Sequence, residues 1–347
     1  MKRSIALLPA VALMICAGPA IAQQKAKAQN VPEIAYDSVP NFLKLPLGEY
    51  LGESVAVATN SKGHVFVYHR AAPTTKLWEF DQDGNFLKEI GKGYYGFEFA
   101  HSVRVDNEDN IWTVDEGTNV VTKFSPDGKV LMVLGRRPPA VQGAVATPSG
   151  PNQPSQKYIF CRPTDVGWDM QGNIFVSDGY CNNRVVKYDK NGRFLAQAGS
   201  EKAGKEPGQF ALPHGLQVDR QGNVYVADRT NARYQVLDND LKPKAIYDNV
   251  GVGWTACVSQ GPHQYLFASN SNPNGNPPGS WAITGEIYKM ELDGTIIGRF
   301  GHPSKEMGGF QVMHMMDCRN PNELILGEIE SWRVQKFILK NQQRAGN

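Results

Sequence analysis

Short runs in which hydrophobic and polar residues alternate recur along the chain, separated by clusters of Asp, Gly and Asn. Three of these stretches share one frame without a gap: HSVRVDNEDNIWTVD from His101, TDVGWDMQGNIFVSD from Thr164 and HGLQVDRQGNVYVAD from His214. If the first residue is position 0, Asp stands at +5 and +14, Gly or Asp at +8, and Asn at +9. Alternation with a period of two is typical of β-strands, and the Asp-to-Asn cluster is typical of a tight turn. Each stretch therefore predicts two strands joined by a hairpin turn.

Three weaker copies fit the same frame: VAVATNSKGHVFVYH from Val55, TACVSQGPHQYLFAS from Thr255 and HMMDCRNPNELILGE from His314. In several copies a third strand follows and ends near a second turn, as in KFSPDGKV and KYDKNGRF. Six units of this kind, spaced by about forty to sixty residues, indicate a propeller with four strands per blade. We therefore predict an all-β fold, a six-bladed β-propeller over residues 34–341. The last copy lacks an obvious fourth strand, so an N-terminal strand is expected to supply it and close the ring, which removes an exposed sheet edge.

Composition agrees with this fold class, because 35 Gly and 22 Pro among 347 residues favour a turn-rich β fold over a helical one. Residues 1–22 are predicted to be a signal peptide, since a basic start, an apolar run and an Ala-Ile-Ala cleavage site follow one another. Lipoprotein processing at Cys16 fits less well because the bulky Ile15 precedes it, and a retained anchor is the weaker alternative. We expect a secreted or periplasmic protein with no membrane span after signal removal, a disordered linker over 23–33 and a disordered tail over 342–347.

The charge balance argues against one class of partner. Loss of Lys2 and Arg3 with the signal peptide would take the formal net charge from +2 to about zero. The sequence contains neither a basic patch nor a marked excess of Lys and Arg. Because binding to nucleic acid depends on such positive charge, we expect no nucleic-acid partner.

The position-0 slot carries the first candidate chemistry. His101, His214 and His314 fill it in the second, fourth and sixth copies. Alternate blades of a six-bladed ring are separated by about 120°, so three imidazoles could converge on one axial ion. Three His ligands with an open fourth position are typical of catalytic zinc. A lone His in such a slot more often bonds a loop, but the chain has only seven His, and three in one slot favour the metal site.

The hairpin also relates residues across its two strands. If the turn centres on +7, antiparallel partners add to fourteen, so position 0 pairs with +14 and −3 with +17. Cys161 is at −3 and Cys181 at +17 of the third copy. In an exported protein a disulfide is the expected outcome, and two free buried thiols are the alternative. Cys257 and Cys318 lie at +2 and +4 of neighbouring copies, and the sequence leaves their pairing open.

The same rule places three polar residues at the end of the channel where position 0 begins. Arg70 and Arg229 are at +15 of the first and fourth copies, and Tyr180 is at +16 of the third. The two arginines alone could form ordinary salt bridges. Beside a metal ion they suggest capture of a carboxylate.

Several of these segments resemble one known family. FCRPTDVGWDMQGNIFVSDGYCNNRVVKY, LPHGLQVD with VADRTNARYQV, and FVYHR are similar to segments of peptidyl-α-hydroxyglycine α-amidating lyases, and the resemblance runs from about Leu51 to Leu339. It implies an NHL-type six-bladed propeller that holds zinc on its axis and cleaves a C-terminal α-hydroxyglycine to a peptide amide and glyoxylate. The family's site residues fall on residues already singled out: zinc ligands on His101, His214 and His314, the catalytic tyrosine on Tyr180, arginines on Arg70 and Arg229, and a disulfide on Cys161 and Cys181.

The resemblance implies a definite chemistry for a peptide or small-molecule substrate with a C-terminal carboxylate, or for a related small carbinolamide. Zinc would act as a Lewis acid on the substrate hydroxyl, and Tyr180 would take the hydroxyl proton. A phenol titrates near about 10 in isolation, so zinc and an arginine must stabilise the phenolate. Arg70 or Arg229 would hold the carboxylate.

The family also holds a structural calcium. The resemblance places it on the backbone carbonyls of Val57 and Val103 and on an aspartate one residue after the third zinc histidine, a position that is Met315 here. A thioether is a poor ligand for a hard cation, which prefers oxygen. The sequence therefore gives calcium little support, and without it methionine packing would have to hold this part of the core.

Two other readings of the propeller compete with a zinc lyase. In a non-enzymatic NHL-repeat propeller the blades would only present a rim for a protein or glycan partner, and the histidine triad would be dispensable. A calcium-dependent, lactonase-like hydrolase would need a cluster of carboxylates and Asn on the axis, and the repeat frame aligns no such cluster.

Overall fold

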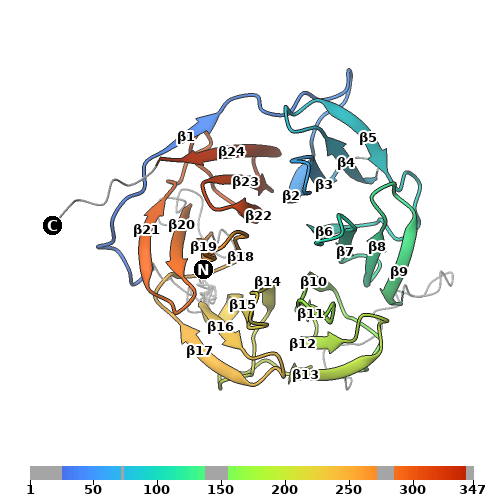
Figure 1. The fold of residues 1–347 in the computed structure, drawn as a ribbon, viewed down its shortest axis with the longest axis vertical. Coiled ribbons are helices and arrows are strands. Elements are labelled where there is room, and N and C mark those ends of the chain that lie inside the picture. The colour runs from blue at the N-terminus through green and yellow to red at the C-terminus, as the bar shows by residue number, and fades with distance from the viewer. Residues whose placement is uncertain (1–25, 72–73, 137–154, 272–284, 341–347) are drawn as a thin grey trace, which may run out of the picture.

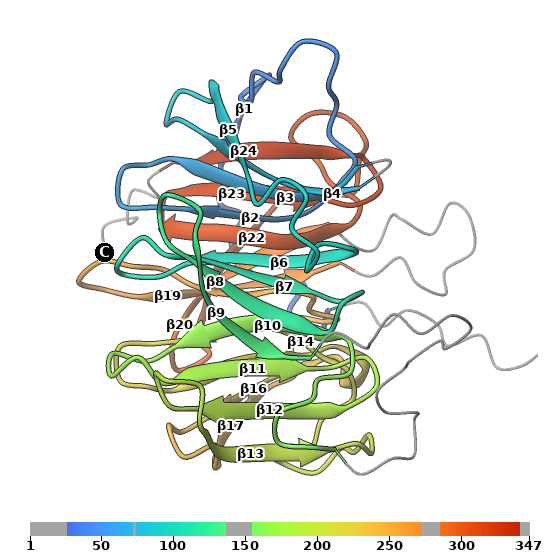
Figure 2. The same cartoon turned by 90° about the vertical axis from the view of Figure 1, so that its right-hand side faces the viewer.

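The protein is an all-β ring of six four-stranded antiparallel sheets, as the repeat frame predicts (Figure 1). The computed structural model describes residues 26–71, 74–136, 155–271 and 285–340. Within each blade the first strand of the repeat lies at the centre of the ring and the last lies at the rim, and Figure 2 shows the ring edge-on. The predicted signal peptide, residues 1–22, and the predicted tail, residues 342–347, lie outside the described residues. None of the described segments forms a helix long and apolar enough to cross a membrane.

Each of the first five blades is a run of four strands that are consecutive in the chain. Their bounds are β2 (Glu53–Thr59), β3 (Val65–Arg70), β4 (Thr75–Phe80) and β5 (Phe86–Ile90) in blade one; β6 (Ala100–Val105), β7 (Ile111–Asp115), β8 (Val120–Phe124) and β9 (Val130–Gly135) in blade two; β10 (Pro163–Trp168), β11 (Ile174–Asp178), β12 (Asn183–Tyr188) and β13 (Phe194–Ser200) in blade three; β14 (Pro213–Val218), β15 (Val224–Asp228), β16 (Arg233–Leu237) and β17 (Pro243–Tyr247) in blade four; and β18 (Ala256–Val258), β19 (Tyr265–Asn270), β20 (Glu286–Glu291) and β21 (Ile296–Phe300) in blade five. A short 3-10 turn, η1 (Arg229–Asn231), follows β15.

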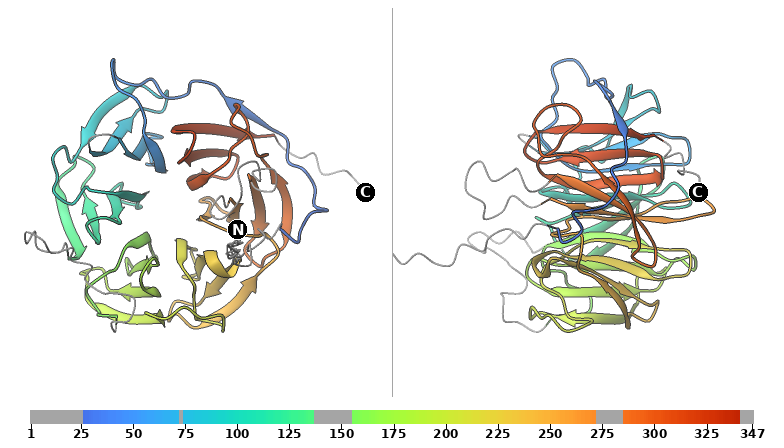
Figure 3. Two further views of the ribbon diagram at one scale, coloured as in Figure 1. Left: turned by 180° about the vertical axis from the view of Figure 1, so that it is seen from behind. Right: turned by 90° about the vertical axis from the view of Figure 1, so that its left-hand side faces the viewer.

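The sixth blade joins the two ends of the described chain. It contains β22 (Met313–Asn320), β23 (Glu323–Glu328) and β24 (Arg333–Leu339), and β1 (Tyr36–Val39) pairs antiparallel with β24 as its outermost strand. Figure 3 shows this N-terminal segment running along the outside of the ring. The last blade therefore takes its fourth strand from the N-terminal segment.

Part of the segment expected to be a disordered linker contacts the ring, in the portion that is described from residue 26 on. Ala26 is only 2% exposed and lies in a core cluster with residues of blades four and five. The backbone N–H of Ala28 donates to the carbonyl oxygen of Asn249 at 2.9 Å. The backbone of Glu33 forms an isolated parallel β-bridge with that of Arg299. The small alanine side chains in this polar stretch let its backbone lie close to the ring, a tertiary effect that composition does not reveal.

The two aspartates of the repeat close its turns and anchor its loops. At +5, Oδ1 of Asp169 accepts the backbone N–H groups of Gln171 and Asn173 at 3.0 and 2.9 Å, which closes the hairpin turn. At +14, Asp178 accepts the N–H of Cys161 at 2.8 Å and the guanidinium of Arg184 at 2.9 Å. The +14 aspartate therefore ties the loop that enters a blade to the strands inside it.

The hydrophobic core lies between neighbouring blades rather than in one central mass. One cluster joins Val114 of blade two to Val166 of blade three, and another joins Phe175 of blade three to Leu216 of blade four. Burial of such a side chain stabilises the fold by about 1.5–3 kcal/mol. The apolar faces of the blades are therefore buried in contacts between blades. Polar side chains such as the three histidines can then occupy the axis of the ring.

Candidate metal centre

The histidine slot of the repeat lies on a β-bulge, which the hairpin rule does not anticipate. In blade two, Asp115 at +14 pairs with Ala100 at −1, so His101 at position 0 is the extra residue of the bulge. The register shifts in the same way at His214 and at His314. The predicted pairing of position 0 with +14 is therefore wrong by one residue. A bulge redirects the side chain of its extra residue, and here the side chain turns toward the axis.

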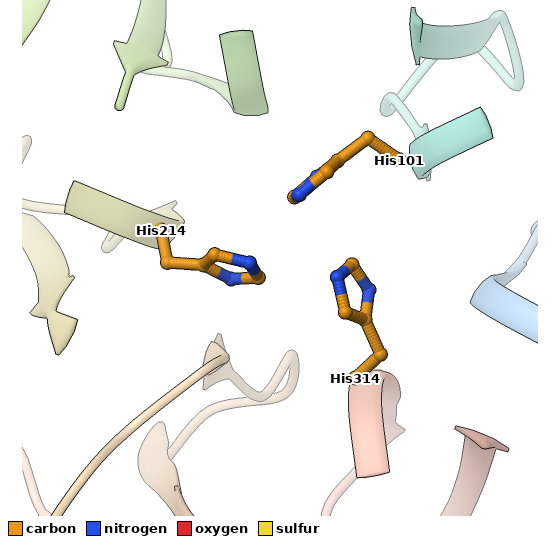
Figure 4. Close-up of side chains that lie close together, drawn as sticks. All are labelled: His101, His214 and His314. Atoms are coloured by element: carbon orange, nitrogen blue, oxygen red, sulfur yellow. The ribbon is translucent and has the colours of Figure 1, made fainter. Parts of the chain in front are cut away.

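Three imidazoles from alternate blades converge on the axis. His101 lies in β6, His214 in β14 and His314 in β22, and Figure 4 shows the rings turned toward a common centre. The ring centroids lie between 4.6 and 4.8 Å apart, and one nitrogen of each ring lies within 4.8 Å of the others. Among the described residues, this is the one group of three or more His, Cys, Asp or Glu side chains close enough to hold a metal ion.

The blades between the histidines supply the acceptors that orient them. In each case Nδ1 lies 2.6 to 2.8 Å from a backbone carbonyl oxygen of the next blade: His101 from Thr164, His214 from Trp254, and His314 from Val55. A carbonyl oxygen only accepts, so each Nδ1 must carry the proton and each Nε2 must present its lone pair. A backbone carbonyl that fixes the tautomer in this way is typical of metal-binding histidines. The alternation of the repeat thus has a physical reason: ligand blades alternate with orienting blades.

The electrostatic state of the triad also fits a metal ion. All three imidazoles are buried, and burial lowers the pKa of each well below the ordinary histidine value. Neutral imidazole is the form that binds a metal. Nε2 of His214 is buried and has no hydrogen-bond partner among the described residues, and a polar atom in that state is costly unless a ligand satisfies it. Three neutral nitrogen donors with space for a fourth ligand are the donor set of catalytic zinc.

Tyr180 lies beside the triad, directly after β11. Its hydroxyl is 3.3 Å from Nε2 of His101, and its ring centroid is 6.1 Å from that of His214. Burial raises the pKa of the Tyr180 phenol, and Glu116 raises it further, whereas nearby arginines, chiefly Arg229, lower it. A ligand on a metal ion bound by the histidines would therefore also lie close to the Tyr180 hydroxyl.

Arg70, at the end of β3, is already engaged within the protein. Nη1 lies 3.0 Å from a carboxylate oxygen of Glu53, and Nε donates to the carbonyl oxygen of Ala100 at 2.8 Å. Its guanidinium also lies 3.6 Å from the centre of the Phe99 ring and 3.7 Å from Glu116. The structure brings Arg70 close to the histidine triad, at the end of the ring axis that is called the mouth from here on. Its contacts leave it few free hydrogen-bond donors.

Arg229, the first residue of η1, is in a different state. It is 7% exposed, and its guanidinium lies 3.7 Å from the centre of the Trp254 ring. The hydroxyl of Tyr180 interacts with its guanidinium, and the charge of Glu116 acts on it from a longer distance, but no carboxylate of the described residues forms an ion pair with it. Burial lowers the pKa of Arg229, because a charged group is costly to bury. Arg229 is therefore the arginine at this mouth best suited to receive an anionic ligand.

Two residues of the mouth were missed by the sequence-based prediction. Glu116 occupies the same +15 slot as Arg70 and Arg229, is 3% exposed, and lies 3.8 Å from Nε2 of His101. Arg162 is at −2, the position that the hairpin rule pairs with Tyr180 at +16, and its guanidinium lies 4.5 Å from the centre of the Tyr180 ring. Inspection of the +15 and −2 slots in every copy would have identified both residues.

Two disulfides hold the elements around the site. Cys161–Cys181, predicted from the hairpin rule, is present with a Cα–Cα distance of 5.3 Å and flanks Tyr180 directly. Cys257–Cys318, which the sequence left open, is also formed, with a Cα–Cα distance of 6.1 Å. It joins β18 of blade five to β22 of blade six.

The structure does not fit the calcium site that the resemblance places on Val57, Val103 and the position of Met315. Nη2 of Arg104 lies 3.8 Å from Sδ of Met315, so a guanidinium contacts the side chain that would have to be the third ligand. Arg104 is 5% exposed and pairs with the fully buried Asp165 at 3.0 and 2.5 Å. A fixed positive charge at this point repels a divalent cation. The ion pair between Arg104 and Asp165 connects blades two and three in place of a shared calcium ion.

This arrangement predicts a stability that does not depend on calcium. Millimolar calcium chloride added to chelator-treated protein should leave the Tm unchanged, because a ligand stabilises only a fold that binds it. Arg104→Met should lower the free energy of unfolding by about 3–5 kcal/mol, because the Asp165 carboxylate would be left buried and uncompensated. The exposed Arg220→Met serves as the control, with a change within about 0.5 kcal/mol. A rise in Tm with calcium would contradict this account.

Comparison with known proteins agrees with the propeller fold and gives relatives named as lyases. The NHL repeat family matches residues 210–237. The chain is 33% identical over 253 residues to a mouse (Mus musculus) peptidyl-glycine α-amidating monooxygenase, which covers 63% of this chain and 24% of that protein. It is 30% identical over 212 residues to a probable peptidyl-α-hydroxyglycine α-amidating lyase of Caenorhabditis elegans, which covers 55% of this chain and 57% of that protein. The chain thus spans less than two thirds of the length of either relative.

Among solved structures, virginiamycin B lyase from Staphylococcus aureus superposes with a TM-score of 0.53 at 10% identity, over 89% of this chain and all of that one. At this identity the superposition supports the propeller fold alone. The sequence matches carry the relationship further, because their identities are 30–33% over more than 200 residues. The chain is therefore a six-bladed propeller with a match to the NHL repeat family at residues 210–237, and it is similar in sequence to proteins named peptidyl-α-hydroxyglycine α-amidating lyase.

Proposed function

We propose that the protein is a zinc-dependent lyase that cleaves a C-terminal α-hydroxyglycine, or a related small carbinolamide, into an amide and glyoxylate. The observation that carries the proposal is the convergence of the three histidines with the Tyr180 hydroxyl 3.3 Å from Nε2 of His101. The names of the homologous lyases support an amidation-related reaction of this kind.

In the proposed reaction one proton moves from oxygen to nitrogen and one carbon–nitrogen bond breaks, with no net change in oxidation state. The hydroxyl of the carbinolamide loses its proton, the carbon–oxygen bond becomes a carbonyl, and the carbon–nitrogen bond breaks. The electron pair of that bond stays on nitrogen, which takes a proton to become the amide, and the other product is glyoxylate. The site must therefore bind a carboxylate, accept a proton from a hydroxyl and return one to nitrogen.

The residues of the mouth suit these tasks. When bound, zinc would supply Lewis acidity that favours ionisation of the hydroxyl. His101, His214 and His314 would hold the ion through Nε2, in the neutral state that their burial favours. Tyr180 would take the hydroxyl proton and return it to the leaving nitrogen, because its own hydroxyl lies beside the triad.

Substrate recognition is assigned to Arg229 rather than Arg70. Arg229→Gln should raise the KM for a carboxylate substrate by about 10- to 100-fold, since a hydrogen bond between charged groups contributes about 1.5–3 kcal/mol. Arg70→Gln should change KM less, because Arg70 is paired with Glu53. Steady-state kinetics with each variant check this, and a substrate whose carboxylate is replaced by an amide is the control. The assignment is contradicted if Arg229→Gln affects both substrates equally.

We also propose that the protein acts outside the reducing cytosol, in the periplasm or after secretion. The two disulfides support this compartment, because such bonds persist in oxidising environments. The partner would then be a peptide or small molecule that ends in a carboxylate.

The direct test is a product assay. Zinc-loaded protein is incubated with α-hydroxyhippurate, and glyoxylate and benzamide are measured separately. The proposal predicts both products in equal amounts. No release above the uncatalysed rate would overturn it and would favour a propeller that only binds a partner.

A further inference from the structure

The mouth holds a carboxylate for which the proposed reaction has no direct use. One oxygen of Glu116 accepts both Nε of Arg162, at 2.7 Å, and Nη2 of the same guanidinium. The other oxygen lies 3.7 Å from Nη2 of Arg70 and 3.8 Å from Nε2 of His101. Glu116 is thus a buried anion between two arginines at the edge of the histidine triad.

Arg162 in turn contacts Tyr180. Its guanidinium carbon lies 4.5 Å from the centre of the Tyr180 ring, a distance typical of a cation–π contact. The backbone N–H of Tyr180 also donates to the carbonyl oxygen of Arg162 at 3.4 Å, and the Cys161–Cys181 disulfide lies alongside. The backbone of Arg162 is therefore fixed by the hairpin, while its side chain, half exposed to solvent, depends on Glu116 for its orientation.

We propose that Glu116 is a positioning residue: it holds Arg162 against the ring of Tyr180, so that Arg229 alone receives the substrate carboxylate. This inference rests on the proposed lyase function.

The charges at the mouth explain why such a residue is needed. Without Glu116, the half-exposed guanidinium of Arg162 would be free to compete with Arg229 for the substrate carboxylate, whereas Arg70 would still be paired with Glu53. Some of the resulting complexes would not place the substrate hydroxyl beside Tyr180. Loss of orientation of this kind lowers kcat without weakening binding.

The central variant is Glu116→Gln, which keeps the size of the side chain and one acceptor oxygen. We expect kcat to fall by about tenfold or more, with KM unchanged or lower and with zinc content at the wild-type level. Glu116→Asp, which keeps the charge, should restore part of kcat. Glu108→Gln, at a side chain that is 81% exposed, is the matched control and should behave as wild type.

A double-mutant cycle separates positioning from a merely structural role. If Glu116 acts through Arg162, Arg162→Met should also lower kcat, and the double variant should be no worse than the more impaired single variant. Multiplicative losses, or a Glu116→Gln variant with wild-type kcat, would overturn the inference. Loss of bound zinc from Glu116→Gln would overturn it too, because Glu116 would then act on the metal site itself. Absence of glyoxylate with the wild-type protein overturns the proposed function, whereas an active wild type with an unaffected variant overturns this inference alone.

Discussion

Replacement of His214 by alanine is expected to remove the metal ion and with it all measurable glyoxylate release. His214 is fully buried, its Nδ1 lies 2.6 Å from the carbonyl oxygen of Trp254, and its Nε2 has no hydrogen-bond partner in the part of the chain that the structure describes. Alanine would leave two imidazoles, which cannot hold zinc as three do. Metal analysis should fall from about one zinc per chain to well below that, and product formation should fall to the uncatalysed rate.

The matched control for this variant is His263→Ala. His263 is exposed and pairs with Glu291 at 2.6 Å, far from the triad in the repeat frame. This variant should keep its zinc and its activity. A His214→Ala protein that is folded and still releases glyoxylate at the wild-type rate would show that the triad has no part in the reaction.

Replacement of Tyr180 by phenylalanine is expected to lower kcat by about 10²- to 10⁴-fold, the range typical of a lost general base. The ring and its contact with Arg162 would remain, and only the hydroxyl that lies 3.3 Å from Nε2 of His101 would be lost. Zinc content and Tm should therefore stay near their wild-type values. Single-turnover measurement of glyoxylate formation on the zinc-loaded variant checks the chemical step itself.

Tyr50→Phe is the control for Tyr180→Phe, because Tyr50 is 78% exposed. It should be indistinguishable from wild type. A Tyr180→Phe variant with unchanged kcat would mean that another group moves the proton, and the role given to the phenol would be wrong.

Local sequence pattern was enough to predict the ring and the convergence of the histidines. Period-two alternation and the Asp-to-Asn turn are local signals, and they placed β6, β10 and β14 in one frame. Once the frame was set, the hairpin rule correctly joined Cys161 to Cys181. The strands, the turns and the disulfide were predictable because each depends on residues within one blade, and the convergence of the histidines then followed from the symmetry of a six-bladed ring.

The features that the sequence did not reveal depend on contacts between blades or on backbone detail. The bulge at His101 leaves the spacing of the repeat unchanged, so no gap in the sequence marks it. The ion pair between Arg104 and Asp165 joins position +3 of one copy to position +1 of the next. The +15 slot alone places Glu116 at the mouth, but its position between Arg70 and Arg162 is seen only in the folded ring. Turn chemistry and periodicity describe single blades, whereas the site is built where several blades meet.

The central claim is that the three histidines hold a zinc ion on which the lyase reaction depends, and one titration tests it most directly. Protein stripped of metal is given zinc in increasing amounts, and glyoxylate release from α-hydroxyhippurate is measured at each step. The account predicts no release from the stripped protein and a linear rise that ends at one zinc per chain. Release that is unchanged by stripping, or none at full loading, would contradict it.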